Sequence, residues 1–250
     1  MRKFICLCLL LQAAILSALI TEDSASANAL SGVTLLSSSV ADHQLSPLIG
    51  VSGFSLSYSR PFNMGNLGVY SLNSAFPAGF LDLNLGASYL DEGDYLWQDL
   101  RLGAAVGYGL LDLGVNGHLL YERFSTRQSY HSLAADLALR LGDDDYAAEF
   151  RWLHPGLQDA QLHITLASQV TGDIGAATSY VYLPQGKDML RTATRCEIGE
   201  NFLLLTSWQS APSRFGAGIG VIWGRGELTY AVRSHPQLSL THCLDIAFGW

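Results

Sequence analysis

Short stretches of strict alternation between apolar and polar residues run along most of this chain. The clearest is the last one, where Leu240–Trp250 has one face that is almost wholly apolar and another that is small or polar. The two stretches before it, 215–223 and 227–233, follow the same rule. A period of two is typical of a β-strand, and a helical period fits none of the three stretches.

Similar alternation continues upstream, separated by short turns rich in Gly, Asp and Asn. The regular apolar faces lie at 54–58, 81–89, 100–108, 113–121, 133–139, 146–152 and 162–166. Less regular segments with strand composition lie around 66–75, 174–183, 189–198 and 201–209. The count is 12 to 14 strands, depending on whether Ser31–Val40 is one of them. The pattern therefore predicts a single all-β domain, an antiparallel meander of about 14 strands.

The faces opposite the apolar ones carry most of the charged residues. In a soluble β-sandwich these residues would be solvated, and that alternative fits each of them singly. After the first 27 residues, however, the chain has Lys187 as its only lysine beside eleven arginines. The planar guanidinium group pairs with carboxylates in a fixed geometry, which suits a crowded lumen. Tyr and Trp near the strand ends match interfacial girdles, so the pattern favours a transmembrane β-barrel, which closes to satisfy every backbone group in lipid.

Ten charged residues at predicted inward positions form a candidate lumen ladder. They are Asp99, Arg101, Asp136, Arg140, Glu149, Arg151, Arg195, Glu227, Arg233 and Asp245. Several of the acids and arginines are two or four residues apart on one face, where pairing with neighbouring strands is natural. The ladder is interpreted as a structural filling of the lumen, with a selective permeation path as the alternative. Alternating glycines at 216, 218 and 220 are expected to relieve crowding inside a narrow barrel.

The first and last residues carry targeting signals. Arg2 and Lys3, an apolar run and the small residues Ala25-Ser26-Ala27 predict a secretory signal peptide over 1–27, with an N-terminal membrane anchor as the alternative. Residues 28–47 then form a possible plug, and 48–250 form the barrel. The final aromatics Phe248 and Trp250 resemble the C-terminal signal that the barrel-assembly machinery recognises. The predicted location is the outer membrane of a Gram-negative-type bacterium, in contact with its lipid.

Four segments resemble the PorV/PorQ-like barrels of the long-chain fatty acid transporter (FadL-type) superfamily. They are Ala29–Ser59, Pro61-Phe62, Phe76–Gly79, and Leu228–Leu238 with Thr241-His242. The resemblance implies a 14-stranded barrel. In the transporters of this superfamily the N-terminal segment plugs the barrel and a nearby strand contributes a lateral opening. Where members often carry Asn-Pro-Ala-Gly, this chain keeps only Pro47 and Gly50.

Composition excludes several other function classes. The chain is 49% apolar with a net charge of −8, and its basic residues are scattered, so a nucleic-acid partner is not expected. No Gly-x-Ser-x-Gly elbow or other nucleophile motif is present, so an enzyme is not expected. No Cys/His spacing resembles a zinc site, so neither a metal nor a cofactor is predicted. Cys196 and Cys243 lie in separate strand-like segments. The sequence leaves open whether they form a disulfide or remain two free thiols.

Two functions remain open from the sequence. The first is transport of a small hydrophobic or amphipathic molecule, which follows from the fold and the family resemblance. The second is a non-transporting envelope scaffold, or a secretion-associated barrel of the PorV/PorQ type, with other envelope proteins as partners. Short loops and a densely charged lumen favour the second. The position of residues 28–47 relative to the lumen would distinguish them.

Overall fold

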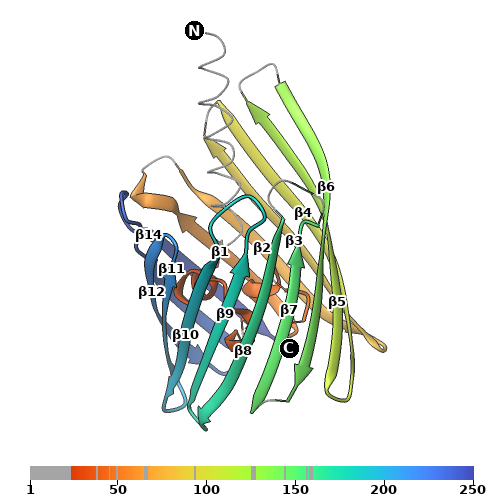
Figure 1. Cartoon of the computed structure of the whole chain (residues 1–250), viewed down its shortest axis with the longest axis vertical. Coiled ribbons are helices and arrows are strands. Elements are labelled where there is room, and N and C mark those ends of the chain that lie inside the picture. The colour runs from red at the N-terminus through yellow and green to blue at the C-terminus, as the bar shows by residue number, and fades with distance from the viewer. Residues whose placement is uncertain are drawn as a thin grey trace.

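The chain forms one closed β-barrel in the computed structural model (Figure 1). The structure describes residues 24–250 except 38, 45, 49, 65–66, 93, 125–127, 144, 156 and 158–159. The predicted signal peptide therefore lies almost wholly outside the described residues.

Fourteen antiparallel strands make up the wall, each paired with its neighbours in chain order. The strands are β1 Gly53–Arg60, β2 Val69–Ala78, β3 Leu81–Glu92, β4 Tyr95–Tyr108, β5 Leu111–Phe124, β6 Gln128–Gly142, β7 Tyr146–Leu153, β8 Gln161–Thr171, β9 Ile174–Tyr182, β10 Met189–Ile198, β11 Phe202–Ser210, β12 Ser213–Trp223, β13 Gly226–Arg233 and β14 Thr241–Gly249. The barrel closes where β1 pairs with β14, from Gly53 opposite Gly249 to Arg60 opposite His242. The predicted all-β meander of about 14 strands is confirmed.

Apolar side chains cover the outside of the wall, as the alternation predicted. Along β12, Phe215 and Ile219 are 62% and 61% exposed, whereas the glycines between them face inward. Leu133, Leu166 and many other large apolar residues are exposed in the same way. An apolar exterior around a polar interior is the pattern of a barrel whose wall faces lipid.

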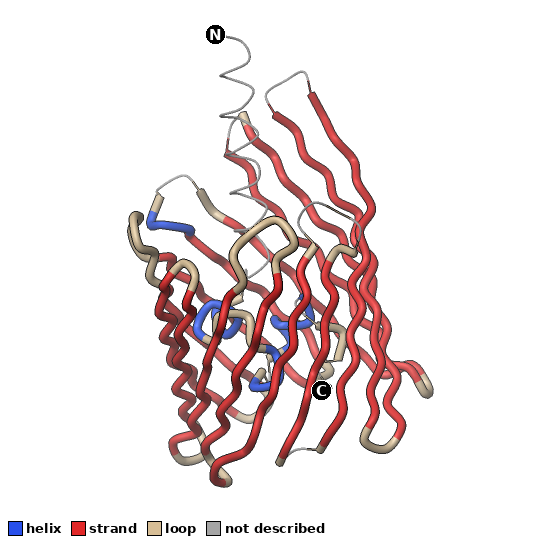
Figure 2. The backbone as a smooth tube through the Cα atoms, in the orientation of Figure 1, coloured by secondary structure: helices blue, strands red, loops and turns tan. Residues whose placement is uncertain are grey.

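The interior holds the segment that precedes β1. It contains the helix α2 (Ala25–Ala29) and two short 3-10 helices, η1 (Thr34–Leu36) and η2 (Val40–Gln44), all seen inside the wall in Figure 2. Ser31–Val40, counted above as a possible strand, therefore contributes a 3-10 turn and not a strand. A third 3-10 helix, η3 (Pro61–Asn63), follows β1. None of the helices among the described residues is long and apolar enough to cross a membrane.

Candidate functional site: the plugged lumen

Residues Ser24–Leu48, called the plug below, lie across the lumen. The helix α2 contacts β11 to β14 and β1, η1 contacts β8 to β10, and η2 contacts β1 to β3 and β14. Ser24 caps α2, because its side chain accepts a hydrogen bond from the backbone N–H of Ala27 at 3.0 Å. Apolar plug residues such as Leu30 and Val33 are only 1% exposed and form a small core with inward residues of the wall, among them Leu205. The predicted plug 28–47 falls within this segment.

Glycines in the wall make room for the plug. A Cβ atom at Gly216 would stand 2.6 Å from the carbonyl oxygens of Asn28 and Ala29, and one at Gly218 would stand 2.8 Å from Ala29 Cβ. Gly114 is similarly close to Pro47 and Leu48. The inward glycines of β12 thus fit the plug helix itself, which is more specific than the relief of crowding expected from sequence.

An ion pair on β7 binds the middle of the plug. Glu149 accepts hydrogen bonds from Thr34 Oγ1 at 2.7 Å and Ser46 Oγ at 3.0 Å, and lies 3.3 Å from Arg151 Nε. Arg151 Nη2 donates to the carbonyl oxygen of Gly32 at 2.9 Å. Both charged side chains are almost fully buried. Plug and wall are therefore joined by charge-assisted hydrogen bonds, which are stronger than neutral ones.

Two further carboxylates bind the start of the plug. Asp42 of η2 accepts hydrogen bonds from Ser26 Oγ at 2.6 Å and from the hydroxyls of Ser24 and Ser37. Asp245 of β14 accepts the backbone N–H of Ala25 at 2.6 Å. Burial raises the pKa of Asp42 above its usual range, although the three serine hydrogen bonds oppose this. The first turn of the plug thus donates hydrogen bonds to two buried acids.

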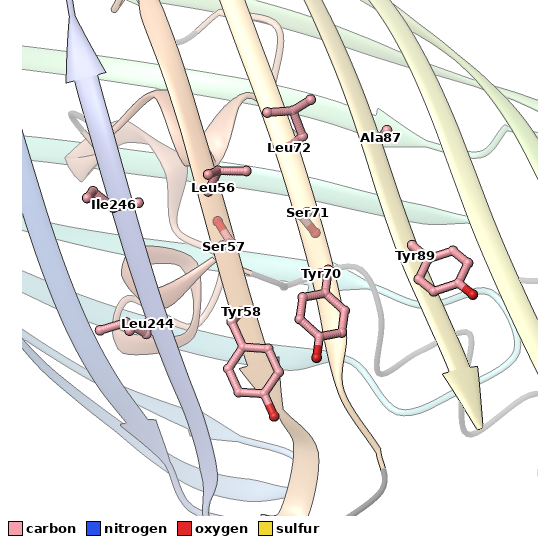
Figure 3. A pocket seen from close by; sticks show the side chains of 10 residues that line it. All are labelled: Leu56, Ser57, Tyr58, Tyr70, Ser71, Leu72, Ala87, Tyr89, Leu244 and Ile246. Carbon is pink, nitrogen blue, oxygen red and sulfur yellow. The ribbon is translucent and has the colours of Figure 1, made fainter. Parts of the chain in front are cut away.

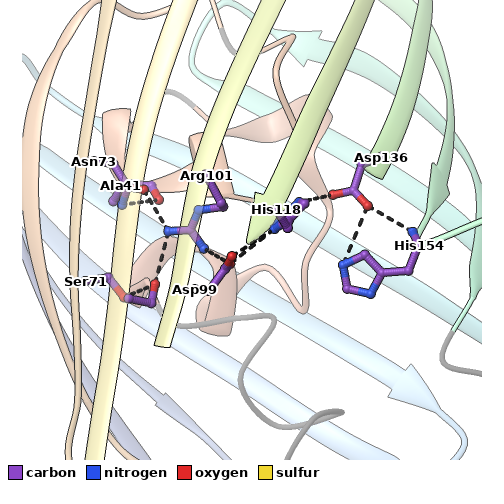
Figure 4. Close-up of polar contacts among 9 residues, drawn as sticks. Ala41, Ser71, Asn73, Asp99, Arg101, His118, Asp136 and His154 are labelled. Carbon is purple, nitrogen blue, oxygen red and sulfur yellow. Dashed lines mark hydrogen bonds and ion pairs between the residues drawn. The ribbon is translucent and has the colours of Figure 1, made fainter. Parts of the chain in front are cut away.

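Strands β4 to β6 and the turn after β7 carry a second set of polar contacts, called the histidine network below, beside the Glu149–Arg151 pair on β7 (Figure 4). Arg101 Nη1 donates to Asp99 at 3.0 Å, and Asp99 lies 3.2 Å from His118 Nδ1. His118 Nε2 lies 2.8 Å from Asp136 Oδ2. Asp136 also accepts the backbone N–H of His154 at 2.9 Å. These five residues come from β4, β5, β6 and the turn after β7, and they bind mainly to one another.

The remaining predicted ladder residues have local partners. Arg195 Nη2 donates to Glu197 at 2.7 Å, while Arg233 Nη2 donates to Gln209 at 2.8 Å. Glu227 accepts from Thr229 at 2.7 Å. Arg140 lies 3.9 Å from Asp112, so Asp136 and Arg140, which share one face of β6, contact different groups.

The structure also shows the surroundings of the predicted C-terminal signal and of the two cysteines. Phe248 stacks on Phe54 of β1 with ring centroids 5.2 Å apart, and Trp250 lies 6.5 Å from the same ring. Both aromatics therefore lie at the seam where the barrel closes. Cys196 and Cys243 form no disulfide with each other, and Cys243 Sγ donates a hydrogen bond to Ser59 Oγ at 3.2 Å.

An apolar pocket of about 450 Å³ lies on the outer surface over β14, β1, β2 and β3 (Figure 3). Tyr58, Tyr70 and Tyr89 line one side, and Ala87 lies opposite Leu72 on the other side. The inward residues Ser57 and Ser71 border the pocket from the wall behind it. Sequence reasoning did not find this pocket, because its residues come from four strands.

Comparison with known proteins supports the fold. No family model and no curated protein sequence matches this chain. Among solved structures, the CymD monoaromatic hydrocarbon channel aligns with a TM-score of 0.71 and 10% sequence identity, over 92% of this chain and 98% of that one. The two proteins share a barrel fold. A triple mutant of the Rhodopseudomonas blastica porin aligns with a TM-score of 0.47 and 6% identity, over 80% of this chain and 99% of that one.

Proposed function

We propose that this chain is a bacterial outer-membrane channel for small hydrophobic molecules, and that the plug is its gate. The observation that carries the proposal is the plug itself. The plug is a short segment that lies inside the barrel but is not part of its wall. Movement of this segment could therefore open or close a path for the transported molecule without breaking the barrel. The apolar exterior supports a location in lipid.

Two observations indicate the class of molecule. The solved channel with the same fold is named for monoaromatic hydrocarbons, and we extend that class to this chain as part of the proposal. The outer pocket of about 450 Å³ is apolar and bordered by tyrosine rings. A cavity of roughly 150 Å³ already accommodates benzene, so this pocket has room for a molecule with one aromatic ring.

Uptake and conductance test the proposal together. Cells of a Gram-negative strain that lacks other hydrophobic channels should take up toluene faster when they express this chain. In planar bilayers, Gly216→Leu should raise ion conductance above that of the unmodified chain, because the new side chain occupies the space of Asn28 and Ala29.

The matched control is Gly117→Leu. Gly117 lies on an outward position of β5, where an added Cβ meets only the carbonyl oxygen of Leu102 at 3.8 Å. This variant should keep the low conductance of the unmodified chain. If Gly216→Leu folds but does not conduct, and the unmodified chain gives no toluene uptake, the transport proposal fails.

The second candidate is a non-transporting envelope scaffold, and a specific observation favours it. The plug and the buried polar contacts together fill much of the lumen, which suits a barrel that only anchors partners. This candidate predicts that other envelope proteins co-purify with the chain after crosslinking in membranes. Recovery of the chain alone under those conditions would count against it.

A further inference from the structure

Three donor groups converge within the histidine network, each from a different element. His118, Asp136 and His154 offer ligand atoms that all lie within 4.8 Å of one another. His118 Nε2 is 2.8 Å from Asp136 Oδ2, and His154 Nε2 is 3.7 Å from Asp136 Oδ1. The two imidazole rings are 5.3 Å apart and edge to face, as seen beside Asp136 in Figure 4. The carboxylate therefore lies between two imidazole nitrogens that point toward it.

The backbone directs His154 into this cluster. β7 ends at Leu153, which pairs with Asp136 in the middle of β6, so the chain leaves the wall beside that carboxylate. His154 has a φ of +47°, a left-handed conformation that few non-glycine residues adopt. Its backbone N–H donates to Asp136 Oδ1 at 2.9 Å, and the residue is only 9% exposed. The strand end thus fixes a buried imidazole next to a buried carboxylate.

The other side of His118 is held by a second carboxylate. Both oxygens of Asp99 lie 3.2 Å from His118 Nδ1, and Arg101 holds Asp99 through a 3.0 Å hydrogen bond. Arg101 is fixed in turn by Asn73 and Ser88, at 3.1 and 3.0 Å. A carboxylate that accepts the N–H of one ring nitrogen leaves the other nitrogen as the ligand atom, the usual outer-shell arrangement around histidine metal ligands.

We propose that His118, Asp136 and His154 bind one divalent transition-metal ion, with Zn²⁺ as the best fit. Ligand atoms around a tetrahedral Zn²⁺ at roughly 2.0–2.1 Å from the ion stand about 3.3 Å from one another. His118 Nε2 lies 2.8 Å from Asp136 Oδ2 and His154 Nε2 lies 3.7 Å from Asp136 Oδ1, and one ligand atom from each of the three residues lies within 4.8 Å of the other two, so modest side-chain adjustment gives zinc-ligand spacing. Small rotations of the rings admit the ion, which replaces the proton shared by His118 Nε2 and Asp136.

The donor set also selects the class of metal. Two imidazoles and one carboxylate suit Zn²⁺ and its neighbours Cu²⁺, Ni²⁺ and Fe²⁺, whereas Ca²⁺ and Mg²⁺ require oxygen ligands. Three protein ligands leave a fourth position for water or for an exogenous ligand. The sequence spacing did not predict this site because its three residues lie on separate elements, 18 positions apart.

Titration of the untagged full-length chain with Zn²⁺ in detergent micelles tests the site. Calorimetry should give one ion per chain. His154→Ala, which changes a residue outside the strands, should weaken Zn²⁺ binding at least tenfold. Asp99→Asn should weaken it about 10-fold to 100-fold, because it removes the group that orients His118. His131→Ala, an outward-facing histidine of β6, is the matched control and should leave the affinity unchanged.

Spectroscopy of the Cu²⁺-loaded chain identifies the ligands independently. Electron paramagnetic resonance should show two imidazole nitrogens in the unmodified chain and one in His154→Ala, with circular dichroism confirming that both retain the barrel. The proposal is overturned if the folded chain binds none of Zn²⁺, Cu²⁺ and Ni²⁺. It is equally overturned if His154→Ala leaves binding intact while His131→Ala abolishes it. Neither outcome depends on whether the barrel transports hydrophobic molecules.

Discussion

Two parts of the lumen wall use the same residue types in different ways. Around Glu149, Arg151 and Asp245, charged side chains bind the plug, and the glycines of β12 leave space for it. In the histidine network, Asp99, Arg101 and their partners bind mainly to one another, and contact the plug through Asn73 Nδ2, which donates to the carbonyl oxygen of Ala41 at 3.3 Å. Inward-facing charges along a barrel strand therefore serve two purposes, fixing a segment inside the lumen or cross-linking the wall, and only their partners distinguish the two.

The largest effect is expected from deleting residues 24–27. The deletion removes the hydroxyl donors of Ser24 and Ser26 to Asp42 and the Ala25 N–H donor to Asp245. Hydrogen bonds to charged groups contribute about 1.5–3 kcal/mol each, so the docked plug should be destabilised by on the order of 5 kcal/mol, partly through the internal contacts of Ser24 and Ser26 with Asp42 and partly through the Ala25 bond to the wall. Bilayer conductance should rise as in Gly216→Leu.

The same contacts lead to an expectation about processing. Cleavage before Asn28 would leave Asp42 and Asp245 buried without these donors, so we expect the mature protein to retain Ser24. The intact mass of the chain purified from membranes measures this directly. A mass that starts at Asn28, with low conductance, would show that the plug docks without its first turn.

The next largest effects, on stability and conductance, are expected from one variant in each part of the wall. Glu149→Ala and Asp99→Ala each remove one partner of a buried ion pair, which should lower the free energy of unfolding by about 3–5 kcal/mol. Urea unfolding in detergent checks both values. Only Glu149→Ala should also raise conductance, because Glu149 holds Thr34 and Ser46 of the plug. Equal conductance in the two variants would mean that the two parts of the wall act as one unit.

The smallest effect is the pH dependence of plug docking through His43. Its Nε2 lies 2.7 Å from the carbonyl oxygen of Val51, and burial lowers the pKa of His43 below its usual 6.5, although Asp42 and Asp82 oppose this. A lowered folded-state pKa means that docking is strongest above pH 6.5 and weakens as the pH falls toward the folded-state pKa. Through this one group, the free energy of plug docking changes by at most about 1.4 kcal/mol per pH unit.

Conductance measured between pH 7.5 and 5.5 therefore should increase on acidification. The raised pKa of Asp42 acts in the opposite direction, because protonating that buried acid favours docking. His43→Gln keeps an amide donor for the Val51 carbonyl and removes the titrating group. The difference between His43→Gln and the unmodified chain isolates the histidine, and identical pH profiles would contradict its role.

The fold was readable from sequence because alternation separates an apolar from a polar face along each strand, and the arginines and terminal aromatics then favoured a barrel over a sandwich. Stretches such as 240–250 carry that information in every second residue, and strand pairing in chain order follows from the short turns. The same pattern placed Asp99 and Glu149 on inward positions. It contained nothing about their partners, because those partners lie on other strands or in the plug.

The plug shows why the rest was harder to predict. Ala25-Ser26-Ala27 has the small side chains that a signal peptidase accepts, and the same three residues form the start of α2, which packs against Gly216 and Gly218 through the following Asn28 and Ala29. One local pattern thus fits two physical requirements. The contacts of Ser24 and Ala25 with Asp42 and Asp245 are the basis for expecting that this segment is retained, and the intact mass tests that expectation.

The hydrogen bond between Ala25 and Asp245 joins residues 220 positions apart. Ala25 precedes β1, whereas Asp245 lies on β14, the strand that closes the barrel against β1. The start of the plug therefore has no complete docking site until β14 has paired with β1. Docking of the plug is in this way coupled to closure of the barrel, and a docked plug implies a wall whose seam has already formed.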